Sequence, residues 1–246
     1  MKLLKAIVRR AIEGRGYHVF SRSFLGFDAM ADFKVLLAGA PAPIVADVGG
    51  FLGGFAVGIS SAIPSARVHS FEPAPVNFER LTAHTCRHPN ITVVNLALGA
   101  EAGERDFHVN AAPATSSFFQ PTADGLRQMP PGALECRAPA KARVARLDDY
   151  ANEHGLGRID LLKIDTQGYE LQVLKGAQRL LEAGKVRIVY CEVLFRNLYE
   201  GQCSFGDIHS YLTAHRLAFA GFYDVARSPE NDFMWADALY ISPEHR

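Results

Sequence analysis

The sequence predicts one α/β domain built on an open, mostly parallel β-sheet with helices on both faces. From residue 44 onward, short runs rich in β-branched residues alternate with longer stretches of helical periodicity. The strand-like runs are continuously apolar, which is typical of strands that helices cover on both sides. The 246 residues, 48% of them hydrophobic, suffice for one large core. A ligand is expected at the carboxyl ends of the strands.

Each element of this fold is expected at a definite place in the chain. The strands are predicted, in order, in "PIVADVGG", "ARVHSFEP", "NITVVNLALG", "IDLLKIDTQG", "VRIVYCEV", "LAFAGFYDV" and "ADALYIS". The helices are predicted in "EPAPVNFERLTAHTC", "YELQVLKGAQRLLEAG" and "SFGDIHSYLTAHR". We therefore expect an N-terminal helical extension over residues 1–40 and the α/β domain over residues 41–246.

The N-terminal segment "MKLLKAIVRRAIEG" is predicted to form a basic amphipathic helix. We expect it to pack on the domain or on a second subunit, so a homodimer is one expectation. Weak contact with an anionic membrane surface is the less favoured alternative, because one short helix of this charge binds weakly.

Residues 110–142 interrupt the alternation of strands and helices. This stretch is rich in Pro, Ala, Ser and Gly and has no sustained period. We interpret it as a long loop or a partly ordered lid, and loops of this length are often functional.

Composition and charge exclude several classes of protein. The 26 basic and 26 acidic residues cancel, so no overall field attracts nucleic acid. The four cysteines form no C-x-x-C pair, which fits a reducing compartment. No stretch approaches the roughly 20 apolar residues of a transmembrane helix, and basic residues interrupt the N-terminal apolar run. We expect a cytoplasmic protein.

The stretch "IVADVGGFLGGF" raises the question of which ligand its glycines serve. The spacing matches neither the G-x-G-x-x-G of dinucleotide-binding folds nor the G-x-x-x-x-G-K-[ST] of phosphate loops. The pattern that remains is Asp47, Gly49 and Gly53, which suits a ligand with an ammonium and no pyrophosphate. S-adenosylmethionine is such a ligand. Gly54 and Gly58 are expected to serve close helix-to-sheet packing instead.

The second strand ends in Glu72, where an acid can accept hydrogen bonds from both hydroxyls of a ribose. Acid–glycine turns after strands are common, and Glu72 can also simply cap the next helix. The order and placement of the glycines and Glu72 together favour a cofactor site.

The chain resembles the FkbM family of S-adenosylmethionine-dependent methyltransferases. The resemblance is carried by "ADVGG", "ARVHSFEPAPVNFERL", "TSSF", "VARLDDY", "IVYCEV", "WADALYI" and above all "LLKIDTQGYELQVLKGA", and it spans roughly residues 44–241. It implies a Rossmann-like class I methyltransferase fold, with a seven-stranded sheet that ends in an antiparallel hairpin. The family motif usually reads D-V-G-A-N-x-G, and this chain has Phe51 at the Asn position.

The resemblance also implies the residues of the cofactor site. Asp47, Gly49 and Gly53 would line the methionine moiety, Glu72 would hold the ribose, and Leu96 and Ala97 would flank the adenine. Asp165 would face the cofactor and the reacting centre. The cofactor-binding set is completed by the neighbouring residues Gly50, Phe51 and Pro73.

Two carboxylates at the ends of neighbouring strands are the leading catalytic candidates. A hydroxyl that accepts a methyl group must lose a proton, which calls for a nearby carboxylate, histidine or metal. Asp165 and Glu192 each end a strand, and Lys163 points to the same side as Asp165. They are expected to act as base and orienter. Two ligands of a divalent metal are a less favoured alternative, because two carboxylates are too few. His209 is the spare candidate for a general base.

Two segments are expected to form the acceptor site. Arg196 and Tyr199 follow Glu192, and Ser116 and Ser117 lie in the long loop. Aromatic walls and hydrogen-bond donors are what sugar recognition requires. Packing of the loops is an equally simple reading of these residues.

The sequence therefore predicts an S-adenosylmethionine-dependent O-methyltransferase that acts on a hydroxyl of a sugar, glycolipid, polysaccharide or related secondary metabolite. The acceptor class comes mainly from the resemblance. One alternative is an NAD-dependent oxidoreductase on a similar sheet, which the absence of G-x-G-x-x-G disfavours. The other is a non-catalytic methyltransferase-like scaffold, which Phe51 motivates.

Overall fold

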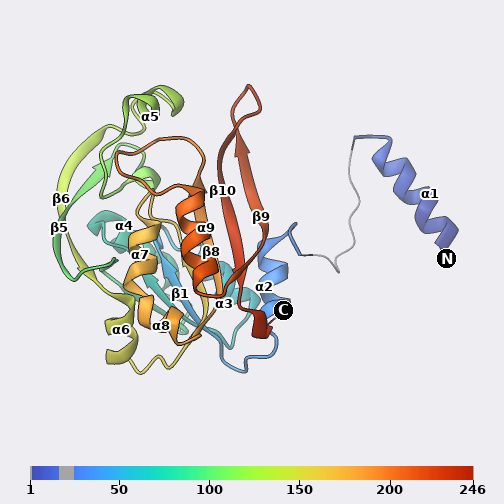
Figure 1. The fold of residues 1–246 in the computed structure, drawn as a ribbon, viewed down its shortest axis with the longest axis horizontal. Coiled ribbons are helices and arrows are strands. Elements are labelled where there is room, and N and C mark those ends of the chain that lie inside the picture. The colour runs from blue at the N-terminus through green and yellow to red at the C-terminus, as the bar shows by residue number, and fades with distance from the viewer. Residues whose placement is uncertain (1, 17–24, 246) are drawn as a thin grey trace.

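The computed structural model describes residues 2–16 and 25–245 and confirms the predicted seven-stranded sheet (Figure 1). The strand order is β3-β2-β1-β7-β8-β10-β9. Only β10 runs antiparallel to its neighbours, so β9 and β10 form the expected closing hairpin. The strands are β1 (Ile44–Val48), β2 (Arg67–Phe71), β3 (Ile91–Val94), β7 (Ile159–Ile164), β8 (Val186–Leu194), β9 (Ala218–Arg227) and β10 (Phe233–Ile241). This is the topology expected of a class I methyltransferase.

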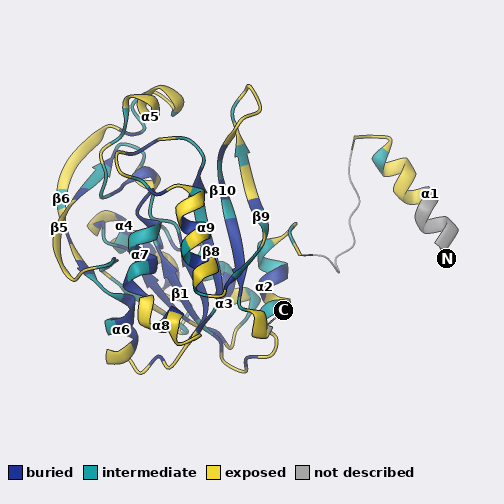
Figure 2. Ribbon diagram, viewed as in Figure 1, coloured by how far each residue is buried: buried dark blue, intermediate teal, exposed yellow. Residues whose placement is uncertain are grey.

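Helices cover both faces of this sheet. The helices of the described residues are α1 (Lys2–Glu13), α2 (Ala29–Leu37), α3 (Gly54–Ala62), α4 (Pro75–Thr85), α5 (Ala123–Gln128), α6 (Leu147–Glu153), α7 (Glu170–Gly176), α8 (Gln178–Glu182) and α9 (Phe205–Ala214), with short 3-10 turns η1 (Pro113–Thr115) and η2 (Pro243–His245). One core packs α2 and α3 on the sheet, and the other packs α6 to α9 on the opposite face. The strands between them are buried (Figure 2).

Helix α2 falls inside the segment predicted as an N-terminal extension and yet belongs to the core. Its Asp28 cap accepts a hydrogen bond from the Ala31 amide at 3.0 Å, as helix N-termini require. Phe33 and Leu37 are fully buried against the sheet. Residues 29–37 therefore contribute to the stability of the α/β domain.

The predicted long loop over residues 110–142 is flanked by regular structure that was not predicted from the sequence. A second sheet of three strands has the order β4-β6-β5, with β4 (Ala97–Leu98), β5 (Gly103–Asn110) and β6 (Cys136–Ala145). The expected third strand, "NITVVNLALG", is split between β3 of the main sheet and β4 of this smaller one. In Figure 1, β5 and β6 curve along one side of the molecule below α5. Strands β5 and β6, with the residues between them, form a lid beside the carboxyl ends of β1, β2 and β3.

The described helices give no membrane span. Within residues 2–16 and 25–245, none is long and apolar enough to cross a bilayer.

Candidate active site

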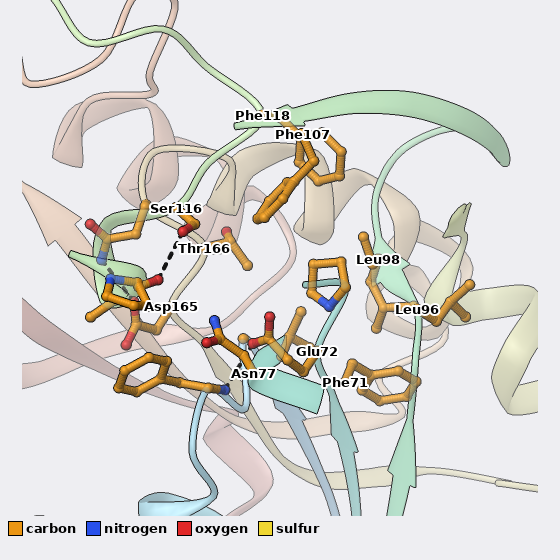
Figure 3. Close-up of a pocket in the computed structure, with 18 residues that line it drawn as sticks. Phe71, Glu72, Asn77, Leu96, Leu98, Phe107, Ser116, Phe118, Asp165 and Thr166 are labelled. Carbon is orange, nitrogen blue, oxygen red and sulfur yellow. Dashed lines mark hydrogen bonds between the residues drawn. The ribbon is translucent and has the colours of Figure 1, made fainter. Parts of the chain in front are cut away.

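A pocket lies where the lid meets the carboxyl ends of β1, β2 and β7 (Figure 3). Its walls come from the glycine turn after β1, the end of β2, the segment around β4, the lid and the turn after β7. The residues assigned from the sequence that line it are Gly49, Phe51, Glu72, Pro73, Leu96, Ala97, Ser116 and Asp165. Residues up to 116 positions apart in the chain are thus brought to the edge of the sheet where a ligand was expected.

The glycine turn is so tight that side chains would collide with neighbouring backbone. Gly49 has a φ of +79°, and a Cβ there would lie 1.9 Å from the carbonyl oxygen of Asp165. The amides of Gly49 and Gly50 both donate to the Phe71 carbonyl, at 3.0 and 2.8 Å. The turn is therefore pressed between β2 and β7, and glycine is required by the protein's own backbone.

Phe51 occupies a left-handed conformation, with a φ of +48°. Its amide donates to Glu72 Oε2 at 2.9 Å, which ties the glycine turn to the end of β2. Asn tolerates this backbone conformation better than bulky residues do, which gives a local reason for the Asn usual in the family. The contact made by the Phe51 backbone does not depend on the side chain.

Glu72 is the buried acid of the pocket, 5% exposed. Its Oε1 accepts from the Ala74 amide at 2.9 Å, and Asn77 hydrogen-bonds to its side chain. Burial raises the pKa of Glu72 to about 7, against the opposing effect of these hydrogen bonds and of the Lys163 charge. The sequence analysis missed Asn77, although its place on the first turn of α4, just after Glu72, is a usable signal.

The other half of the pocket is apolar. Phe71, Leu96 and Leu98 line its lower wall, and Phe107 and Phe118 lie above them (Figure 3). The Phe107 and Phe118 rings are 5.0 Å apart and nearly perpendicular. An apolar slot beside a carboxylate is suited to a flat heterocycle attached to a diol, as in a nucleoside.

Asp47 lies beneath the glycine turn and does not line the pocket. It is fully buried, accepts from Ser70 Oγ at 2.7 Å and lies 3.3 Å from Lys163 Nζ. Lys163 also donates to the Gly49 carbonyl at 2.8 Å and lies 3.6 Å from Asp165 Oδ2. Burial opposes the Lys163 charge, but Asp165 and Asp47 together raise its pKa above the usual value. The charged Lys163 side chain thus stabilises the glycine turn through its hydrogen bond to the Gly49 carbonyl.

Asp165 and Glu192 are linked by the carboxamide of Gln167. Its Nε2 donates to Asp165 Oδ1 at 3.0 Å and to Glu192 Oε2 at 2.7 Å. Asp165 lines the pocket with 39% of its side chain exposed, whereas Glu192 lies behind it. Burial, then the charges of Asp165, Glu170 and Asp237, raise the pKa of Glu192 well above its usual range. The structure therefore brings the two predicted carboxylates together.

Asp237 is a third carboxylate that the sequence analysis did not single out. It lies opposite Glu192 on the neighbouring strand β10. Burial and then the charge of Asp165 raise its pKa to about 6, although Tyr190 donates to it at 2.9 Å. Its position in "WADALYI", one of the stretches that carry the resemblance, is the only sequence signal for it.

The remaining predicted residues lie outside the pocket lining. Gly50 and Gly53 shape the turn, and Ser117 donates to the Gln167 carbonyl at 2.8 Å. Tyr199 is fully buried, and its hydroxyl lies 2.9 Å from the Thr115 carbonyl oxygen. Arg196 is ion-paired with Asp232, and His209 on α9 lies 3.3 Å from the Tyr240 hydroxyl. Acceptor contact by Ser117, Arg196 and Tyr199, cofactor contact by Gly50 and Gly53, and the role of His209 as a base stay predictions.

The described acids do not form a recognisable metal centre. Within residues 2–16 and 25–245, no group of three or more His, Cys, Asp or Glu side chains has a geometry that could hold a metal ion. Asp165, Glu192 and Asp237 are instead linked to Gln167 and Tyr190.

Comparison with known proteins gives the chain its relatives. Residues 52–220, more than half of the chain, match the model of the methyltransferase FkbM domain. The 2-O-methyltransferase NoeI of Sinorhizobium fredii is 28% identical over 74% of this chain and 76% of its own length. The 31-O-demethyl-FK506 methyltransferase FkbM of Streptomyces tacrolimicus is 29% identical over 71% of this chain and 72% of its own length.

Two further matches are more distant. The hexuronic acid methyltransferase AglP of Haloferax volcanii is 27% identical over 58% of this chain and 53% of its own length. Among solved structures, magnesium protoporphyrin IX methyltransferase from Synechocystis PCC 6803 covers 86% of this chain and is itself covered to 76%, with a TM-score of 0.47 and 11% identity. The structural similarity is too low to bear on function.

Proposed function

We propose that this chain, which belongs to the FkbM family of S-adenosylmethionine-dependent methyltransferases, methylates a hydroxyl group of a sugar, glycolipid, polysaccharide or related secondary metabolite. Relatives named as a 2-O-methyltransferase, a 31-O-demethyl-FK506 methyltransferase and a hexuronic acid methyltransferase support this class of acceptor. The balanced charge of the chain favours such acceptors over nucleic acid.

The residues of the pocket fit the cofactor. Glu72 offers a buried carboxylate for the two ribose hydroxyls, and Phe71, Leu96 and Ala97 offer an apolar wall for the adenine. Gly49 and Phe51 would lie beside the methionine end, close to Asp165. When bound, S-adenosylmethionine supplies an electrophilic methyl group to this end of the pocket. The role of the pocket is to align that end with the acceptor and to exclude water.

The observation that carries the proposal is the half-exposed carboxylate of Asp165 in the pocket lining. Gln167 occupies its Oδ1, so Oδ2 is the atom that would take the proton from the acceptor hydroxyl as the oxygen–methyl bond forms. Lys163 Nζ lies 3.6 Å from the same Oδ2. Glu192 is proposed to orient Asp165 through their shared amide.

The direct test is a screen with isotopically labelled S-adenosylmethionine against free sugars, glycans and glycolipids, with and without Mg²⁺. We expect label in an O-methyl group of one of these acceptors, identified by mass spectrometry of the product. Transfer to nitrogen or carbon would overturn the O-methyl assignment. Cofactor binding without transfer to any acceptor would favour the scaffold alternative.

Calorimetry with NAD and with S-adenosylmethionine distinguishes the methyltransferase from the NAD-dependent oxidoreductase. Binding of NAD but not of S-adenosylmethionine would favour the oxidoreductase. Family membership favours the opposite result.

A further inference from the structure

The turn after β7 is built to hold Gln167 in an unusual conformation. Glu170 is 1% exposed, and its Oε1 accepts from the Thr166 amide at 2.9 Å, the Thr166 hydroxyl at 3.0 Å and the Gly168 amide at 3.0 Å. These bonds fix the residues on both sides of Gln167, whose φ is +56°. A non-glycine residue with positive φ needs such support from its surroundings.

The side chain of Gln167 places two hydrogen-bond donors between two carboxylates. A carboxamide nitrogen carries two hydrogens, and Nε2 lies 3.0 Å from Asp165 Oδ1 and 2.7 Å from Glu192 Oε2. Two carboxylates this close would otherwise repel each other or share a proton. The other charged groups that act on Glu192 are Glu170, Asp237 and Lys163. Gln167 thus holds the two carboxyl groups in one arrangement.

The other end of the same residue is attached to the lid. The Tyr199 hydroxyl lies 3.0 Å from Gln167 Oε1 and 2.9 Å from the Thr115 carbonyl oxygen. Ser117 Oγ donates to the Gln167 carbonyl at 2.8 Å. Thr115 and Ser117 flank Ser116, which lines the pocket. Gln167 therefore contacts both the carboxylate pair and the part of the lid that closes the pocket.

Tyr199 is itself held in place by a second glutamine. Gln202 Oε1 accepts from the Leu198 and Tyr199 amides, both at 2.8 Å, and its Nε2 donates to the Arg196 carbonyl at 2.8 Å. The Tyr199 side chain is fully buried. The contact between Tyr199 and Gln167 is thus a fixed part of the fold.

We propose that Gln167 is a positioning residue that holds Asp165 and Glu192 as hydrogen-bond acceptors and sets them against the lid segment Thr115–Ser117. The proposal rests on the proposed function, since it assigns Asp165 the proton of the acceptor hydroxyl. By occupying Asp165 Oδ1, the Gln167 amide leaves Oδ2 for that proton. The predicted roles of Tyr199 and Ser117 change accordingly: both support Gln167 rather than contact the acceptor.

Two variants and one matched control test the proposal. Gln167→Met keeps the length of the side chain and removes both donors. Gln167→Glu keeps the shape but replaces the donating amide by a carboxylate. Gln178→Glu makes the same change on the exposed face of α8, where Gln178 Nε2 lies 2.7 Å from Glu182. All variants are compared with the wild-type chain at several pH values.

We expect Gln167→Met to lower kcat by about 10- to 100-fold, because misplaced catalytic groups lose rates of this order, while the Kd of S-adenosylmethionine changes less than threefold. Gln167→Glu should lose activity at pH 8 and regain it relative to wild type as the pH falls, because the new carboxyl group donates once it is protonated. This recovery within one sample excludes misfolding as the cause. An unchanged kcat in Gln167→Met, or a loss in Gln167→Glu that does not depend on pH, would overturn the proposal.

A second readout needs no acceptor. In protein labelled with ¹³C at the glutamate carboxyls, Glu192 is identified by the signal lost in Glu192→Gln and is titrated by NMR. Its pKa should rise in Gln167→Met, since the ionised form loses a donor, and should not change in Gln178→Glu. An unchanged pKa in Gln167→Met refutes the positioning role. If no acceptor is found but this pKa moves, the proposed function fails while the arrangement around Gln167 stands.

Discussion

At the scale of single residues, Glu72 combines two requirements that oppose each other. Its carboxylate is buried, which disfavours the charge, and it accepts hydrogen bonds from the amides of Phe51 and Ala74, which favours the charge. Burial dominates, so the pKa is raised to about 7. Cofactor hydroxyls would add donors to the ionised form, and binding and ionisation are therefore coupled.

Glu72→Ala should weaken S-adenosylmethionine binding by about 1–3 kcal/mol, as expected when buried hydrogen bonds to a charged group are lost. In the wild type, affinity should rise as the pH increases from 6 to 8, because ionised Glu72 is the better acceptor. This increase of affinity with pH should be absent in Glu72→Gln and retained in Glu79→Gln, an exposed change on α4. Calorimetric titrations at pH 6, 7 and 8 measure it, and a slope that persists in Glu72→Gln would remove Glu72 from the site.

The same raised pKa has the opposite effect on the stability of the free protein. An acid whose pKa is higher in the folded state destabilises that state as it ionises, so the free energy of unfolding should fall between about pH 4.5 and 7. The contribution of Glu72 is at most about 3 kcal/mol. Urea denaturation of wild type and Glu72→Gln over this range gives the difference, and an identical pH dependence would contradict the shift.

Asp165→Asn is expected to lower kcat by at least about 100-fold, because an amide cannot take the acceptor proton. The fold and the Kd of S-adenosylmethionine should be retained. Asp149→Asn, a matched change on α6, should have normal activity, since Asp149 pairs with Arg179 outside the pocket. Single-turnover kinetics at saturating cofactor make the comparison, and normal turnover by Asp165→Asn would refute its role as the base.

At the scale of elements, the turn between β1 and α3 is fixed by its neighbours on both sides. Gly49 lies against the backbone of Asp165, and Gly53, at a φ of +83°, is the N-cap residue before α3. Gly54 was expected to serve helix-to-sheet packing, and this expectation was wrong, because a Cβ there would meet nothing within 4 Å. A Cβ at Gly58 would lie 3.2 Å from the Met30 side chain of α2, so this glycine serves packing between two helices rather than between helix and sheet.

Gly49→Ala should destabilise the protein by more than about 3 kcal/mol, since it combines a clash with backbone and a strained positive φ. Gly54→Ala should be neutral or slightly stabilising, because Ala favours helix and has room there. Denaturant unfolding of the two variants provides the measurement. Equal stability of the two would mean that the turn is less constrained than its contacts indicate.

At the scale of the whole molecule, hydrophobic cores lie on both faces of the sheet. Helix α2 belongs to the α/β domain because it packs in one of these cores. Phe33 is fully buried and packs edge-on against Tyr190 of β8, with ring centroids 5.1 Å apart. The boundary predicted at residue 40 lies after this helix. The predicted cytoplasmic location and homodimer remain predictions that solution measurements must decide.

Phe33→Ala should lower the free energy of unfolding by about 3–5 kcal/mol, as large-to-small changes of a buried aromatic do. Val35→Ala, on the same helix with Val35 68% exposed, should change it by less than about 0.5 kcal/mol. Urea midpoints of both variants test whether α2 belongs to the cooperative unit. A small effect of Phe33→Ala would place α2 outside it.

Local pattern was enough to predict a mostly parallel main sheet and the principal acids of the pocket, whereas the closing hairpin was implied by the family resemblance. Apolar strands and helical periodicity are properties of short segments, and the end of a parallel strand is where a ligand binds, so Glu72 and Asp165 could be chosen from their positions in the sequence. A lid was expected over residues 110–142, but its strands were missed because β5 and β6 are partly exposed and carry Pro, Ala and charged residues without a clear period.

Only the tertiary structure decided which side chains face the cofactor pocket and which support it. Asp47, Tyr199 and Ser117 have the chemistry of site residues, yet the fold buries them against Lys163, Thr115 and Gln167. Gln167 drew no attention in the sequence, because its importance comes from contacts with Glu192 and Tyr199, 25 and 32 residues away. The sequence by itself determined most strands of the main sheet and the acids at their ends. Hydrogen bonds between distant segments then determined the direction of each polar group, since a buried donor or acceptor must find its partner wherever the folded chain places one.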